Sequence, residues 1–140
     1  MNIRLYQESD TESVSALWHE VFPNNPSHNA PELVISQKLA IQPELFFVAE
    51  IDSAIVGTIM AGYDGHRGWL YTVAVSPQYR RLGIGSQLVR HAESAVFAEG
   101  CPKINLQVRA DNAEVVMFYE KLGYVVEERI SMGKLLPPGY

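Results

Sequence analysis

Residues 69–87, WLYTVAVSPQYRRLGIGSQ, read as a strand, a basic glycine turn and a helix in direct succession. The apolar run 69–75 stops at Ser76-Pro77, because proline has no N–H and cannot continue a central strand. Beyond the turn, apolar residues recur every fourth position and predict a helix: Ile84, Leu88, Ala92 and Val96. A chain with this order has to place a glycine-rich turn and a helix start at the end of a strand.

This turn has the composition of a phosphate site. Gly83 and Gly85 let a ligand approach the backbone closely. The first N–H groups of a helix have no internal partner, and the helix dipole adds partial positive charge to them. Arg80 and Arg81 stand beside them, so the stretch predicts a phosphate or pyrophosphate ligand. The simpler alternative is a solvated basic turn that only caps a core helix.

Two common nucleotide motifs fit this turn poorly. A P-loop needs G-x-x-x-x-G-K-[S/T], a spacing that the chain lacks. The dinucleotide fingerprint G-x-G-x-x-G matches Gly83 and Gly85, but Leu88 holds the third position. The acidic ribose partner is also missing, since residues 103–108 carry no carboxylate. A nucleotide-binding fold is therefore a rival hypothesis that ATP or NAD binding would reveal.

Length and composition predict one soluble domain, residues 1–140. The net charge of −5, with no basic run beyond Arg80-Arg81, argues against nucleic acid as a partner. No apolar run reaches the roughly 20 residues of a membrane span, and the N-terminus lacks a signal-peptide core. The single cysteine, Cys101, excludes an internal disulfide and suits a reducing cytoplasm, where we expect the protein. No residue cluster has metal-ligand spacing, so no metal is expected.

Periodicity and turn signals predict the order βααβββαβαββ. The sequence Ser9-Asp10-Thr11-Glu12 has the S-x-x-E spacing of a capping box before the first helix, which ends near Phe22. Glycines at 57 and 62 indicate possible bulges. The expected strands are 3–6, 45–51, 54–63, 69–75, 104–108, 124–130 and 132–136, and the later helices are 31–41, 84–99 and 113–122. The crossover helix makes strands 69–75 and 104–108 parallel neighbours in a mixed, largely antiparallel sheet with helices on both faces.

Two motifs together carry a family resemblance. The run V-A-V-x-P followed by R-x-x-G-x-G resembles the acyl-CoA loop of the GNAT superfamily of N-acetyltransferases. Residues 112–124, NAEVVMFYEKLGY, resemble the second acyl-CoA motif of that superfamily, and the element order extends the resemblance over the whole chain. The stretch LQVRADN is similar to one in protein N-terminal acetyltransferases of the bacterial ribosomal type.

The resemblance implies an α/β (α+β) GNAT fold in which the two central parallel strands splay apart and hold acetyl-CoA. It places the pantetheine arm against backbone groups of Val73 and Val75, with the Val73 N–H as the donor to the developing oxyanion. It implies that Asn112 contacts the pantetheine or holds the local turn, and that the Tyr119 hydroxyl faces the thioester sulfur as general acid. The implied pyrophosphate site consists of Arg80, Arg81, Gly83, Ile84, Gly85 and Ser86.

The general base has no obvious candidate. Many members of the family have a glutamate where this chain has Gln107, which cannot accept a proton at neutral pH. Position alone offers four replacements: Glu50, Asp64, His66 and Tyr71. The expected reaction is acetyl transfer from acetyl-CoA to a primary amine of a small molecule or a protein, by direct attack in a ternary complex. A homodimer is compatible with a small enzyme of this kind. The alternative is a non-catalytic acyl-CoA-binding sensor or regulatory module.

Overall fold

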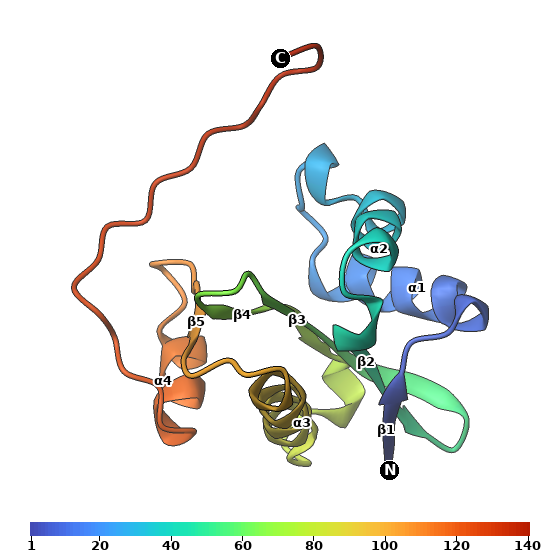
Figure 1. The fold of residues 1–140 in the computed structure, drawn as a ribbon. Helices are drawn as coiled ribbons and strands as arrows, with labels where there is room; N and C mark the ends of the chain where they lie inside the picture. Colours follow the sequence, from blue (N-terminus) through green and yellow to red (C-terminus); the bar gives the residue numbers. More distant parts are fainter. The chain divides into compact units, whose positions relative to one another are not determined.

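The computed structural model describes residues 1–140, which divide into two compact units, Met1–Gln107 and Val108–Tyr140. The first unit contains every strand and three of the helices (Figure 1). Its helices are α1 (Thr11–Val21), α2 (Pro31–Ala40) and α3 (Ile84–Ala98), and the second unit contains α4 (Ala113–Lys121). The expectation of one domain stays a prediction.

The first unit is built on a five-stranded sheet with the order β1-β2-β3-β4-β5. The first three neighbouring pairs are antiparallel, and β4 and β5 are parallel. The strands are β1 (Asn2–Leu5), β2 (Phe46–Ile51), β3 (Ala54–Tyr63), β4 (Gly68–Val75) and β5 (Ile104–Leu106). The predicted mixed, largely antiparallel sheet with one parallel pair is confirmed.

Helices cover both faces of this sheet, as expected. On one face α1 and α2 pack in a core that includes Trp18, Ile35, Phe46 and Met60. On the other face lies α3, seen on the opposite side from α1 and α2 in Figure 1. The alternation along β2 explains the division, because Phe46 faces α1 while its neighbour Phe47 packs its ring on His91 of α3.

The turn between β2 and β3 is tight and left-handed, with φ of 49° at Asp52 and 67° at Ser53. Two successive positive φ angles match the twist of a two-residue hairpin. The pairing of β2 with β3 shifts register beside Gly57, which confirms a bulge at the first of the two suspected glycines. The second suspicion is wrong, because Gly62 pairs regularly with Trp69.

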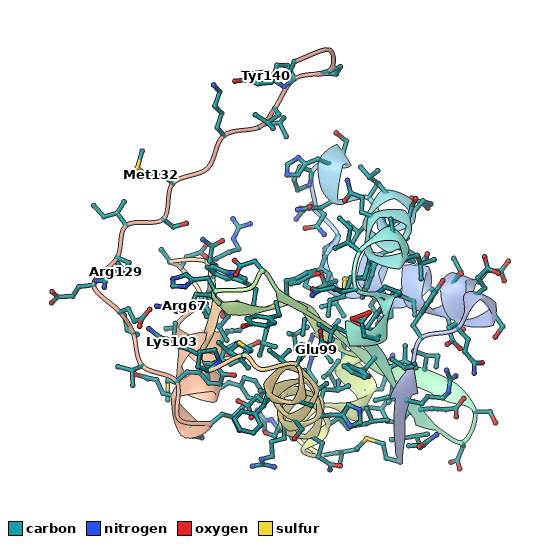
Figure 2. The ribbon with its side chains drawn as sticks, in the orientation of Figure 1. Arg67, Glu99, Lys103, Arg129, Met132 and Tyr140 are labelled. Carbon is teal, nitrogen blue, oxygen red and sulfur yellow. The ribbon has the colours of Figure 1, made fainter.

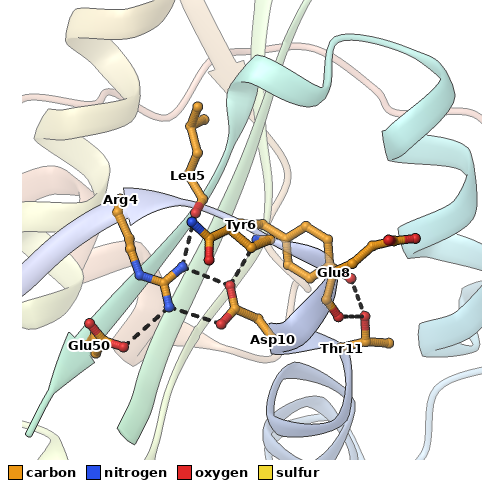
Figure 3. Close-up of polar contacts among 8 residues, drawn as sticks. Arg4, Leu5, Tyr6, Glu8, Asp10, Thr11 and Glu50 are labelled. Atoms are coloured by element: carbon orange, nitrogen blue, oxygen red, sulfur yellow. Dashed lines mark hydrogen bonds and ion pairs between the residues drawn. The ribbon is translucent and has the colours of Figure 1, made fainter. Parts of the chain in front are cut away.

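The capping box expected at residues 9–12 lies instead at residues 7–10, where an ion-pair network holds its aspartate. Arg4 of β1 donates to both oxygens of Asp10 at 2.8 and 2.9 Å and to Glu50 of β2 at 3.2 Å (Figure 3). The Asp10 carboxylate also accepts the backbone N–H of Gln7 at 2.8 Å. The box therefore lies at Gln7 and Asp10, because a bidentate arginine from a strand fixes the orientation of the aspartate.

We expect Arg4→Met to lower the free energy of unfolding by about 2 kcal/mol, because Asp10 (side chain 8% exposed) would lose its charge partner. The hydrogen bonds from Arg4 lower the pKa of Asp10, so this stability is present above pH ~3.8 and is lost as the pH falls through the folded pKa. Urea unfolding at about pH 7 and at about pH 3 checks both statements. Arg109→Met is the control, since Arg109 and Asp111 form an exposed pair at 3.7 Å; equal losses in the two variants would contradict the prediction.

The C-terminal segment corrects a prediction. Residues 124–130 and 132–136 were expected to form a final hairpin, but no helix or strand follows α4. The segment runs extended, with Arg129, Met132 and Tyr140 projecting from it (Figure 2). Only Ser131 separates the two expected strands, and a hairpin turn needs at least two residues. An isolated two-stranded hairpin would also be marginally stable.

Candidate functional site

The parallel strand pair of the first unit ends early on one side. β4 pairs with β5 only from Gly68 to Leu70, opposite Ile104 to Leu106. β4 continues to Val75, whereas β5 stops at Leu106 and not at Val108, as was expected. Beyond Leu70, β4 therefore pairs with β3 on one side and has no strand on the other.

A bulge lies in this part of β4. Thr58 of β3 is opposite Ala74, but Met60 is opposite Tyr71, so two residues of β4 face one residue of β3. Thr72, inside the bulge, has φ of +51°. That value is a genuine outlier for a β-branched residue, and the sequence offers no signal for it, since threonine is a good strand former. The bulge includes Val73, which the sequence analysis selected as the oxyanion donor.

The strand end and the basic turn contact each other. Ser76 donates its N–H to the Val56 carbonyl at 2.8 Å, which closes the antiparallel pairing of β4 with β3. A 3₁₀ turn at Pro77–Tyr79 follows, and the Arg80 Nε then donates back to the Val75 carbonyl at 3.3 Å. The structure thus joins two predicted site residues, Val75 and Arg80, by a hydrogen bond.

The start of α3 exposes its backbone donors. Gly83 is the N-cap with φ of 78°, and no side chain caps the helix. The first helical bond runs from the Gln87 N–H to the Gly83 carbonyl at 3.1 Å. The N–H groups of Ile84, Gly85 and Ser86 precede it and have no helical acceptor, which is the arrangement expected of an anion site.

Close packing fixes where these donors lie. Ile84 is 2% exposed, so it anchors the first turn in the core and offers only its backbone to a ligand. A side chain at Gly57 of β3 would meet Leu88 at 2.9 Å and Ile84 at 3.3 Å. The glycine therefore lets the first turns of α3 lie directly on β3.

The other two predicted site residues lie on α4 in the second unit. Asn112 is the N-cap of this helix, and its Oδ1 accepts the Val115 N–H at 3.3 Å. Tyr119 is 8% exposed, and its ring makes edge contacts with Phe118 and Tyr124 at centroid distances of 5.0 and 5.5 Å. Burial raises the pKa of Tyr119 to about 12, so its hydroxyl keeps its proton at neutral pH.

Three of the four candidate bases have other partners. Glu50 pairs with Arg4. Asp64 accepts the N–H groups of Arg67 and His66, which together lower its pKa and weaken it as a base. Partial burial raises the pKa of Tyr71, whose ring lies below the Lys38 ammonium. His66, the fourth, is in the same turn as Asp64.

Lys38 is a buried residue that the sequence analysis did not single out. It is 5% exposed, donates to the Ala61 carbonyl and lies 5.4 Å above the Tyr71 ring. Desolvation lowers its pKa, and Glu44 and Glu99 oppose that shift in part. A lysine in an amphipathic helix is normally predicted to be exposed, so no pattern in the sequence indicates that Lys38 is buried.

The buried Lys38 predicts a pH dependence of stability. Its folded pKa lies below the ordinary value of 10.5, so between those two values the unfolded chain binds more protons than the native one. The free energy of unfolding should therefore rise with pH in that window. Lys38→Met should flatten the slope, measured by urea unfolding from about pH 7 to about pH 10.5, and the exposed Lys121→Met should not. An unchanged slope in Lys38→Met would refute this assignment.

Comparison with known proteins identifies the family. A family model described as "Acetyltransferase (GNAT) family" matches residues 11–124. "Acetyltransferase YE1169" of Yersinia enterocolitica is 46% identical over 136 residues, which cover 97% of this chain and 96% of the relative. The N-acetyltransferase PaiA of Thermoplasma acidophilum, solved with coenzyme A, aligns with a TM-score of 0.79 at 23% identity, covering 92% of each chain. AAC(6')-Iy with the bisubstrate analogue CoA-S-monomethyl-acetylneamine aligns with a TM-score of 0.80 at 19% identity, covering 97% of this chain and 98% of the other.

The mixed five-stranded sheet and its helices match the fold of acetyltransferases of known structure. The chain belongs to the acetyltransferase (GNAT) family. None of its helices combines the length and the apolar character needed to cross a membrane.

Proposed function

We propose that this protein transfers an acetyl group from acetyl-CoA to a primary amine of a small molecule or a protein. One observation carries the proposal: the unpaired side of β4, with a bulge at Thr72 and Val73, leads directly into a glycine turn with free helix N–H groups. The amide-bearing arm of CoA suits the strand edge, and its pyrophosphate suits the turn. The structural relatives with CoA or a CoA-derived bisubstrate analogue support this choice of donor.

In the proposed reaction the amine nitrogen attacks the thioester carbonyl carbon, and the Val73 N–H stabilises the negative charge on the carbonyl oxygen. The new C–N bond remains when the C–S bond breaks, and the sulfur leaves with the electron pair. By its place in the second motif, the Tyr119 hydroxyl donates a hydrogen bond to that sulfur. The acceptor amine releases its proton to water, because Gln107 cannot take it. The bisubstrate analogue bound to AAC(6')-Iy supports direct transfer in a ternary complex.

Further assignments rest on the motifs. Val75 offers backbone groups to the pantetheine arm, and Arg80 and Arg81 stand beside the pyrophosphate. Asn112 orients the start of α4, where its side chain already caps the helix. A cytoplasmic location is proposed from the single free cysteine, Cys101.

The test is release of free thiol when the protein is incubated with acetyl-CoA and a panel of primary amines. We expect thiol release that depends on the amine, together with thermal stabilisation by CoA. If acetyl-CoA neither binds at micromolar concentration nor raises the melting temperature, the proposal fails. ATP or NAD binding in its place would favour a nucleotide-binding protein.

The second candidate is a non-catalytic acyl-CoA sensor. Gln107 favours it, because an amide stands where many relatives have a glutamate base. Micromolar binding of acetyl-CoA without turnover on any amine would establish this candidate over the first.

A further inference from the structure

The bulge of β4 is tied to β3 by one buried hydroxyl. Thr58 of β3 is 0% exposed, and its Oγ1 donates to the Thr72 carbonyl at 3.3 Å. The same oxygen accepts the indole N–H of Trp18, from α1, at 2.8 Å. An indole nitrogen can only donate, so the Thr58 proton is left for the Thr72 carbonyl, and the direction of both bonds is fixed.

This bond determines the direction of the neighbouring N–H. The carbonyl of Thr72 and the N–H of Val73 belong to one peptide group, and the chain has no cis peptide bonds. In a trans peptide these two groups point in opposite directions. Because the Thr72 carbonyl points to Thr58, the Val73 N–H points away from β3. β5 lies on that side of β4 and ends at the position opposite Leu70.

The arrangement needs support because it is strained. Thr72 has φ of +51°, a conformation that a β-branched residue holds only when its surroundings impose it. The hydroxyl of Thr58 is a buried partner that favours this orientation of the peptide. Without it, the peptide between Thr72 and Val73 can rotate toward an ordinary strand conformation and turn the N–H of Val73.

We infer that Thr58 is a positioning residue for acetyl transfer: its hydroxyl aims the Val73 N–H at the carbonyl oxygen of the bound acetyl group. The inference rests on the proposed function. Thr58 acts only through the peptide it holds, so it should influence turnover far more than the affinity for CoA.

The test compares Thr58→Val with Thr58→Ser. Valine has nearly the same shape but no hydroxyl, so kcat should fall about tenfold, less than the 10²–10³-fold seen when an oxyanion donor is lost outright. The KM for acetyl-CoA should stay within about twofold, since the phosphate donors of α3 are untouched. Serine keeps the hydroxyl and should restore most of kcat.

Valine also leaves the Trp18 N–H without an acceptor, so some stability will be lost. Ile35→Ala, in the same core, is the control for that loss, with kcat compared at a temperature where all variants are folded. If the wild type is active and Thr58→Val has the same kcat as Ile35→Ala, Thr58 does not position the Val73 N–H. That result would leave the proposed function itself intact.

A second readout does not depend on turnover. The amide resonance of Val73 in the free protein should shift in Thr58→Val and return in Thr58→Ser. An unmoved resonance would overturn the inference even if kcat fell. A wild type that binds acetyl-CoA and transfers nothing would instead overturn the proposed function, and the role in transfer with it.

Discussion

Replacing Tyr119 by phenylalanine should lower kcat 10- to 100-fold and leave the affinity for CoA nearly unchanged. The substitution removes one oxygen and keeps the ring, which packs on Phe118 and Tyr124. An interaction made only as charge develops on the sulfur affects the transition state and not the ground state. Steady-state kinetics and calorimetric titration with CoA separate the two quantities.

The pKa of Tyr119 refines the chemistry of this step. A thiol has a pKa of about 8.5, whereas burial raises the pKa of Tyr119 to about 12. Complete proton transfer from the phenol to the thiolate would then cost about 5 kcal/mol, at 1.36 kcal/mol per pKa unit. A hydrogen bond to the charged sulfur is worth about 1.5–3 kcal/mol, which gives the range expected for kcat. Tyr119 therefore serves better as a donor that stays protonated than as a full general acid.

The pH profile distinguishes these two roles. If Tyr119 stays protonated to about pH 12, its ionisation should not reduce kcat between about pH 8 and pH 10 in the wild type. Tyr63→Phe, on a half-exposed tyrosine at the end of β3, is the matched control. Equal kinetics in Tyr119→Phe and wild type would remove Tyr119 from the reaction. A fall in kcat below pH 10 that Tyr119→Phe abolishes would refute its raised pKa.

The order of the elements was predictable because local signals agree with one another. Pro77 follows the end of β4, Gly83 precedes α3, and Gly100 follows it with φ of 99°. The proline and glycine signals and the spacing of the apolar residues therefore indicate the same boundaries. The parallel pairing of β4 and β5 followed from the crossover helix between them. Such agreement of local and global preference is what makes a sequence readable.

The failures have tertiary causes. Arg4 of β1 forms an ion pair with Asp10, so the capping box lies at residues 7–10 and not at the expected residues 9–12. A single Ser131 between the two expected strands is too short to form a hairpin turn. No local sequence pattern predicts the strained φ of Thr72 or the burial of Lys38, because both arise only when distant elements pack around these residues.

Replacing Gly85 by leucine should raise the dissociation constant for CoA at least about 100-fold, which is about 2.7 kcal/mol. Gly85 lies in the first turn of α3, where its N–H is one of three without a helical acceptor. A branched side chain at this position would keep a pyrophosphate from approaching the backbone. Gly85 is helical, unlike Gly83 with its φ of +78°, so a leucine at Gly85 does not strain the backbone.

The stability of the variant separates loss of the site from loss of the fold. Leucine is a better helix former than glycine by about 0.8 kcal/mol, so the melting temperature of Gly85→Leu should not fall. Ser94→Leu adds the same side chain to an exposed position on the same helix and should leave CoA binding intact. If Gly85→Leu binds CoA as tightly as Ser94→Leu does, the pyrophosphate does not lie on the first turn of α3. The phosphate contacts would then have to come from Arg80 and Arg81 alone, with a binding constant that depends more steeply on salt.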